Sequence, residues 1–402
     1  MRKLACVITL AGWLMGVVGV EASLSLNYQF NGKGNWSLDA VGGNNTPVGN
    51  LRAVVPAHST VVKAFLYSTR TPGGAFTIPT IGFDGKIIGT NLWTALGDNP
   101  GGGQAYRADV TAQVAAKIGS GGPGTNTFSI DSEDLNQETD GEALAIVYSN
   151  PAETVRTIAF LDGFSASAGD QTTFHFASPL VMGTGFQALM SLGIGYSYQS
   201  EGSQQYSIVD VNGRRLTTSA GGEDDGISAD GGLITVGGIG DNPANPVDPY
   251  ATPTNPRSDD ELYNLAEGNG TNAAPFLSNG MTSFQVNTLN PSGDDNIFFL
   301  GLNVTAKGNI NGGGGGCSSG SDLLAQVDAL GLRRSRTARL ERQVVIIQKA
   351  LMRQNFKAAR ADCGVLGRYL AALVRLGALS SSDADSVAGC CDSLSTSSVS
   401  SD

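Results

Sequence analysis

The chain has 402 residues, of which 55 are glycine, and only 15% are charged. Glycine averages about 7% in ordinary proteins and weakens helix interiors, so this composition excludes a mostly helical fold. The formal net charge of −11 makes a nucleic acid an unsuitable partner, because its phosphates repel an acidic protein.

The N-terminal segment is predicted to be a secretory signal peptide, residues 1–22. Two basic residues precede the apolar run 4–20, and Val20-Glu21-Ala22 fits a small-residue cleavage site. The alternative is a membrane anchor, which the short run disfavours because a span needs ~20 residues. We therefore expect a secreted or cell-surface protein with no transmembrane span after cleavage.

Composition changes sharply at the five consecutive glycines 312–316, which predict a flexible linker. Residues 23–316 have a net charge of −15, and residues 317–402 have a net charge of +3. The predicted organisation is a signal peptide (1–22), a first β-sandwich (23–152), a second β-sandwich (153–308), a linker (309–320), a helical domain (321–394) and a disordered tail (395–402).

The first part of the mature chain reads as many short strands bounded by turn residues, which is typical of sandwiches. Nearly 300 residues are too many for one sandwich, so the predicted fold class is mainly β, with two tandem or packed antiparallel β-sandwiches. The expected strands are 61–67, 127–130, 143–148, 157–161, 205–209 and 297–304.

A weak internal repeat indicates a duplication. The strand 127–130 leads through the acidic turn 140–142 into 143–148, and the strand 283–286 leads through the acidic turn 293–296 into 297–304. Upstream of each, Asp84-Gly85 and Asn212-Gly213 are candidate hairpin turns. Chance similarity between Asp-rich hairpins is the alternative.

The segment after the linker has apolar residues at helical spacing, and helices are expected over 322–330, 336–352 and 356–376, with a short last helix. Four cysteines remain after signal cleavage, and an exported protein uses an even number of cysteines for disulfides. Cys317 and Cys363 are each expected to bond Cys390 or Cys391, in an order that the sequence leaves open. Basic residues crowd these helices, which predicts either a solvated face or a surface that docks on an acidic partner.

Catalytic motifs are weak. Histidine occurs only as His58 and His175, and His175 alternates with Phe174 and Phe176, which predicts a solvent-facing strand residue. No HExxH motif is present. A hydrolase that uses two carboxylates remains as an alternative, but no acid stands out. We therefore predict that the protein is not an enzyme, with no catalytic and no cofactor-binding residues.

Acidic loops are the most pointed feature, because Ca²⁺ takes oxygen ligands from such loops in exported proteins. The candidate calcium ligands are Asp224, Asp225, Asp230, Asp294, Asp295 and Asn296. The competing interpretation is structural, since Asp and Asn side chains also cap their own turns.

Several strings resemble a family of uncharacterised bacterial and archaeal secreted surface proteins with tandem β-sandwich domains, and they lie at 106–111, 140–148, 212–226, 259–263 and 290–298. The C-terminal part resembles small helical modules of bacterial secreted proteins. The resemblance implies a surface or extracellular role. The expected function is a non-enzymatic structural or adhesin-like protein whose partner is an extracellular protein or polysaccharide, and the alternative is a carbohydrate-binding module for an extracellular polysaccharide.

Overall fold

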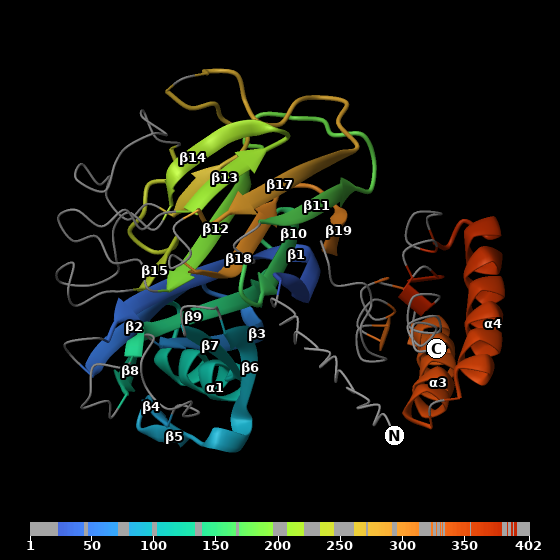
Figure 1. Cartoon of the computed structure of the whole chain (residues 1–402), viewed down its shortest axis with the longest axis horizontal. Coiled ribbons are helices and arrows are strands. Elements are labelled where there is room, and N and C mark those ends of the chain that lie inside the picture. Colours follow the sequence, from blue (N-terminus) through green and yellow to red (C-terminus); the bar gives the residue numbers. More distant parts are fainter. Residues whose placement is uncertain are drawn as a thin grey trace, which may run out of the picture.

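The fold is known from a computed structural model, which describes residues 23–43, 47–70, 80–98, 103–132, 139–165, 169–195, 207–220, 234–244, 261–270, 272–291, 296–312 and, with short gaps, 323–391. The predicted fold class is confirmed, because these residues form antiparallel sheets followed by a helical region with a disulfide (Figure 1).

Within the described residues, the strands form three sheets. The largest has ten strands and runs in the order β15 (Ile234–Val236), β12 (Ala188–Gly195), β18 (Asn296–Val304), β10 (Val155–Asp162), β1 (Ser25–Gly42), β9 (Thr139–Ser149), β3 (Thr60–Arg70), β7 (Gln104–Asp109) and β6 (Trp93–Asp98), with β16 (Leu262–Asn264) also paired to β12. A five-stranded sheet runs β14 (Arg214–Ala220), β13 (Ser207–Val211), β17 (Ser283–Leu289), β11 (Asp170–Phe176) and β19 (Gly308–Gly312). A four-stranded sheet runs β2 (Val48–Val55), β8 (Gly124–Asp131), β4 (Ile81–Phe83) and β5 (Lys86–Ile88).

Strand β1 belongs to both halves of the β region. Its first part, Ser25 to Lys33, pairs with β10, and its second part, Gly34 to Gly42, pairs with β9. Since β10 lies in the second predicted sandwich and β9 in the first, one strand joins the two sandwiches through backbone hydrogen bonds.

The large sheet is folded back on itself along β1. Strands β3 and β18 are four positions apart in its order, which would separate them by roughly 19 Å in a flat sheet. The rings of Tyr67 on β3 and Phe299 on β18 nevertheless have centroids 5.3 Å apart. The two halves of the sheet therefore pack face to face through a shared aromatic core that includes Phe65, Phe160 and Phe298.

The result is a stack of four β layers with three buried cores (Figure 1). The four-stranded sheet and helix α1 (Thr111–Gly121) cover the half formed by β9, β3 and β7, and the five-stranded sheet covers the half formed by β10, β18 and β12. Alternation of buried and exposed side chains along β8 and β11 follows from this arrangement, because each strand has one face against a core.

The two halves share one strand order, which supports the predicted duplication. The outer sheets run β2-β8-β4-β5 and β11-β17-β13-β14, and the inner strands run β1-β9-β3 and β10-β18-β12. The predicted hairpin turns fall at equivalent places and are confirmed. Asp84-Gly85 joins β4 to β5 and Asn212-Gly213 joins β13 to β14, and all four residues have positive φ.

Three local expectations differ from the structure. The predicted acidic turn 140–142 lies inside strand β9 and is buried, because β1 and β3 pair with it on both sides. The glycine-rich stretch 119–124, whose composition predicts a surface loop, contains the last turn of α1 and the first residue of β8. Strand β19 occupies 308–312, so the linker predicted from 309 overlaps a strand that pairs with β11.

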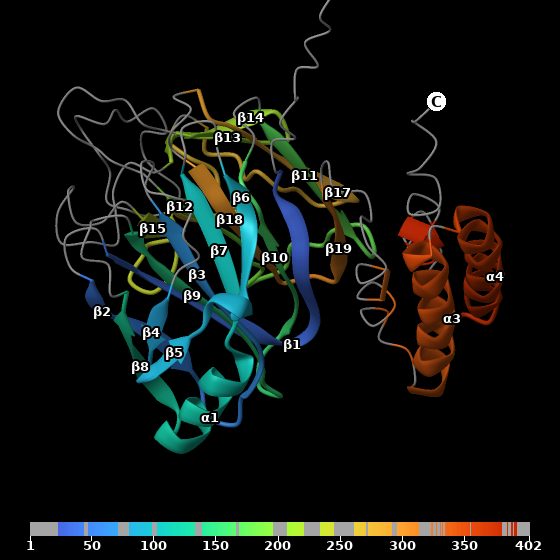
Figure 2. The same cartoon turned by 60° about the horizontal axis from the view of Figure 1, so that its bottom comes forward.

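The helical region contains α3 (Arg334–Met352) and α4 (Phe356–Arg375), which lie side by side (Figure 2). Their shared core includes Leu340, Val344, Leu366 and Leu370. Asn355 is the N-cap residue of α4, and its side-chain oxygen accepts a hydrogen bond from the Ala358 amide. None of the helices in the described residues has the length and apolar character that a membrane span requires.

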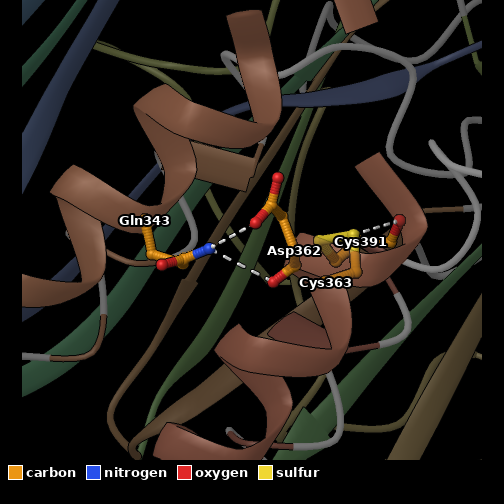
Figure 3. Close-up of a disulfide and its surroundings, with 4 residues drawn as sticks. All are labelled: Gln343, Asp362, Cys363 and Cys391. Atoms are coloured by element: carbon orange, nitrogen blue, oxygen red, sulfur yellow. Dashed lines mark hydrogen bonds between the residues drawn. A yellow bond between two sulfur atoms is a disulfide. The ribbon is translucent and has the colours of Figure 1, made fainter. Parts of the chain in front are cut away.

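The predicted disulfide framework is confirmed in part. Cys363 on α4 is bonded to Cys391, and Cys390 is also disulfide-bonded. Cys317, its predicted partner, lies outside the described residues. Beside this bond, the Gln343 side-chain amide of α3 donates to both the Asp362 carbonyl and carboxylate oxygens, at 3.4 Å each (Figure 3). The disulfide holds the C-terminal residues of the helical region to α4, and the Gln343 contact joins α3 to α4.

Candidate functional site

One end of the folded sheet gathers strand ends from both sandwiches. On the first half, Arg70 at the end of β3 pairs with Thr139 at the start of β9. On the second half, Gly195 at the end of β12 pairs with Ile234 on one side and with Asn296 on the other. We call this region the loop end, because strands β3 and β12 end there and strands β9, β15 and β18 begin there.

The two sandwiches approach closely at the loop end. A Cβ atom placed on Gly195 of β12 would lie 3.0 Å from the Thr69 Cβ of β3 and 3.2 Å from Asp140 Oδ2 of β9. A Cβ atom on Gly141 would lie 2.3 Å from the Val41 carbonyl oxygen and 2.5 Å from the Ile234 side chain. Glycine is therefore required at position 141, where backbone packs closely on backbone, whereas position 195 is crowded by side-chain atoms.

Replacing Gly141 by alanine is expected to destabilise the β region by about 1–3 kcal/mol, because the new methyl group overlaps backbone atoms of β1 that cannot move aside. Chemical denaturation followed by tryptophan fluorescence measures the loss. The matched control is Gly183→Ala, since a Cβ atom at Gly183 meets nothing within 4 Å. Equal stability of the two variants would show that the sheet yields at Gly141.

Most of the predicted calcium ligands lie in segments that the structure does not describe, but it does describe the strands that follow those segments. Asp224, Asp225, Asp230, Asp294 and Asp295 lie outside the described residues. Asn296 is described, begins β18 and is 2% exposed. Because β15 and β18 flank β12, Ile234 and Asn296 are two strand spacings apart, or roughly 10 Å. The strands that follow the two acidic segments, β15 and β18, therefore begin close together in the sheet. Among the described residues, no group of three or more His, Cys, Asp or Glu side chains could hold a metal ion.

The calcium prediction is tested by removing the ion. If a site forms, saturating Ca²⁺ at about 100 times its dissociation constant adds about 2.7 kcal/mol to the free energy of unfolding, and a chelator removes it. Differential scanning calorimetry of the mature chain with calcium and with chelator measures the change. An unchanged melting curve contradicts a calcium site and leaves Asp294 and Asp295 as structural turn residues.

Buried carboxylates at and near the loop end are a feature that sequence reasoning missed. Glu142 on β9 is 1% exposed and accepts a hydrogen bond from the Ser68 hydroxyl at 3.4 Å. Glu261, next to β16, is also buried and accepts a 2.9 Å hydrogen bond from the Tyr263 hydroxyl. Buried carboxylates need such partners, since an uncompensated charge is costly away from water. The acidic residues were visible in the sequence, but their burial depends on strands that are distant along the chain.

A second buried cluster joins the sandwiches through side chains. The Arg107 guanidinium of β7 donates to both Asp162 carboxylate oxygens of β10, at 2.6 Å each. The Tyr67 hydroxyl of β3 donates to Asp162 Oδ2 at 3.0 Å. Asp162 is 3% exposed, so the first sandwich supplies the partners of a carboxylate that the second sandwich buries.

Burial governs the titration of this cluster. It raises the pKa of Asp162 above its ordinary value, although Arg107 and the hydrogen bonds from its partners oppose the rise. Burial also raises the pKa of Tyr67 well above its ordinary value, and the Asp162 charge adds to that effect. The arrangement therefore keeps Tyr67 a neutral hydrogen-bond donor and makes Arg107 the group that favours the Asp162 carboxylate.

His175 takes the predicted position. It lies between the buried Phe174 and Phe176 on β11, with its own side chain only partly covered. It pairs across the sheet with Ser283 and Asn309, and neither is an acid that could orient it as a base. The fold and sites together define a tandem β-sandwich protein with an appended, disulfide-linked helical region.

Comparison with known proteins adds little. No protein-family model and no curated protein matches this chain. Among solved structures, it is similar to two complexes of a family 86 glycoside hydrolase with neoagarooctaose, each at 11% identity over 73% of this chain and 35% of theirs, with a TM-score of 0.19. It is also similar to a β-porphyranase of the same family from the human gut bacterium Bacteroides plebeius, at 12% identity over 72% of this chain and 37% of that one, with a TM-score of 0.19. This chain spans about a third of those structures, and at this TM-score the likeness carries no argument about activity.

Proposed function

We propose that this chain is a non-enzymatic secreted or cell-surface structural protein of the adhesin-like kind, in which the β region is a stiff body and the C-terminal helices are an interaction module. The observation that supports the proposal most is the continuity of β1, which pairs with β10 through its first half and with β9 through its second. A body built this way resists hinge motion between its sandwiches, which suits a protein that bears load or presents a contact surface.

The buried polar contacts agree with such a role. Besides the Arg107–Asp162 pair, Arg52 of β2 binds Asp39 of β1 with an Nη2–Oδ1 distance of 2.7 Å and also donates to the Ile239 carbonyl at 3.0 Å. Asp39 is almost fully buried, and this contact fixes β1 to the outer sheet and to the segment after β15. Side-chain contacts thus reinforce the backbone joint between the sandwiches.

The test compares three activities of the purified mature chain. Binding to immobilised extracellular proteins or to intact cells, without glycan selectivity, is the result that the proposal expects. Selective signals on a glycan array would instead favour a carbohydrate-binding module. Release of reducing ends from extracellular polysaccharides would overturn the non-enzymatic proposal.

A further inference from the structure

The helical region carries an unusual concentration of positive charge. Residues 334–376, which contain α3 and α4, hold ten Lys or Arg residues and two acids, for a net charge of +8. One of the two acids, Asp362, accepts hydrogen bonds from Gln343 between the helices. The charge is therefore far from balanced within the helix pair, while the β region before it is strongly acidic.

Four basic residues of α3 and of the turn after it lie along one exposed face. Arg339, Arg342, Ile346, Lys349 and Arg353 follow one another at spacings of three and four residues, which places them in a single stripe on the helix surface, and all five are exposed. The buried residues of α3 lie on the other side of the helix, where they pack against α4 and the remaining helical residues. We call this stripe the α3 basic face.

Helix α4 repeats the arrangement. Lys357, Arg360, Gly364, Arg368 and Arg375 are exposed and fall on one face at helical spacing. Cys363, Leu366 and Leu370 are buried on the opposite side. Within the described residues, the exposed bases of the two faces make no ion pair. Arg339 makes a cation–π contact, since its guanidinium lies 4.5 Å from the centroid of the Tyr369 ring.

Apolar side chains are interleaved with these bases. Five of the twelve exposed large hydrophobic residues in the described chain belong to the helix pair: Val345, Ile346, Met352, Val365 and Leu376. Met352 is 76% exposed and Leu376 is 72% exposed. Val345 and Ile346 lie between Arg342 and Lys349 on α3. A soluble polyanion attracts the bases but offers nothing to the apolar residues, whereas a lipid surface accepts both.

We propose that the helix pair docks on an anionic phospholipid surface through the α3 basic face, with its Lys and Arg side chains at the headgroup phosphates and Val345, Ile346 and Met352 at the boundary with the acyl chains; the basic face of α4 points away from this surface. Charge complementarity and apolar burial act together in this mode of binding. The inference rests on the proposed role of the helices as an interaction module and names its partner.

The test is cosedimentation of the mature chain, residues 23–402, with vesicles of phosphatidylglycerol and phosphatidylcholine, so that the apolar run of the signal peptide does not contribute. Binding is expected with the anionic vesicles, is expected to weaken with pure phosphatidylcholine, and is expected to fall as salt rises. Each Lys or Arg near an anionic surface adds a factor of about five, so the double variant Arg342→Gln/Arg353→Gln is expected to bind about 30-fold more weakly.

The matched control is Lys86→Gln/Lys307→Gln, which removes the same charge from exposed positions of the β region and is expected to bind like the unaltered chain. The apolar variant Ile346→Ser/Met352→Ser is expected to lose binding about tenfold, because both side chains then lose apolar burial in lipid. Unchanged vesicle binding by this variant, together with equal binding to dextran sulfate, would overturn the lipid proposal in favour of a soluble polyanion. Absence of vesicle binding overturns it as well, and leaves the tests of the β region's partner unaffected.

Discussion

Replacing Arg107 by methionine is expected to lower the free energy of unfolding of the β region by about 3–5 kcal/mol at neutral pH. The substitution removes the guanidinium that contacts both carboxylate oxygens of Asp162 but keeps a side chain of similar length. Asp162 remains buried, so its charge loses its main partner away from water. Denaturant unfolding followed by tryptophan fluorescence measures the effect, because Trp36 of β1 stacks on Phe160 of β10 at 6.3 Å, close to the joint between the sandwiches.

The loss is expected to depend on pH with a definite sign. Burial already raises the pKa of Asp162 in the folded chain, and removing Arg107 removes an opposing effect, so the folded pKa rises further. The unfolded value stays near 3.9. Between these two values the folded variant holds a proton that the unfolded chain has lost, so the stability of Arg107→Met rises as pH falls through this window. The difference from the unaltered chain is therefore largest at neutral pH and shrinks in acid.

Two further variants separate charge burial from general damage. Lys63→Met removes an ion pair with the same nitrogen–oxygen distance as the Arg107–Asp162 pair, since Lys63 Nζ lies 2.6 Å from Asp109 Oδ2. The Lys63–Asp109 pair is partly exposed, so its loss is expected to cost at most about 1 kcal/mol. The double variant Arg107→Met/Asp162→Leu leaves no charge buried and is expected to recover much of the loss. If it is no more stable than Arg107→Met, the damage comes from altered packing and the charge argument fails.

Local patterns in the sequence account for much of the fold. Phe174, His175 and Phe176 alternate in burial as their order predicts, because strand side chains point to opposite faces. Asp84-Gly85 and Asn212-Gly213 form the turns expected of them, since both positions need positive φ and these residues tolerate it. Each of these features depends only on neighbours along the chain.

Strand β1 shows where local reasoning stops. Glycine disfavours strands, and Gly32 and Gly34 gave no signal for a strand of 18 residues. In the fold, Gly34 lies where a Cβ atom would be 2.2 Å from the Tyr148 carbonyl oxygen, so glycine serves close approach to β9. The candidate sites also depend on contacts between residues that are distant along the chain. Arg107 and Asp162 are 55 positions apart, and the burial of Glu142 follows from pairing with strands 74 or more positions away, which no local pattern encodes.

Removing the disulfide between Cys363 and Cys391 is expected to destabilise the helical module by about 3.5 kcal/mol, the loop-entropy value for residues 28 positions apart. A module this small has a limited core, so a loss of this size is a large part of its stability. The variant is Cys363→Ala/Cys391→Ala, because a single substitution would leave a thiol free to exchange with the bond of Cys390. Circular dichroism at helical wavelengths measures the module, and tryptophan fluorescence reports separately on the β body, which contains both tryptophans of the mature chain.

The expected result is loss of the helical signal at lower denaturant, with the tryptophan transition unchanged, since the helices have their own hydrophobic core. The control is Ala371→Ser on the exposed side of α4, which alters a small side chain of the same helix without touching the disulfide and should leave both transitions in place. Coincident movement of the two transitions in the double variant would contradict an independent module. An unmoved helical transition would show instead that the packing of Leu366 and Leu370 against α3 suffices without the bond.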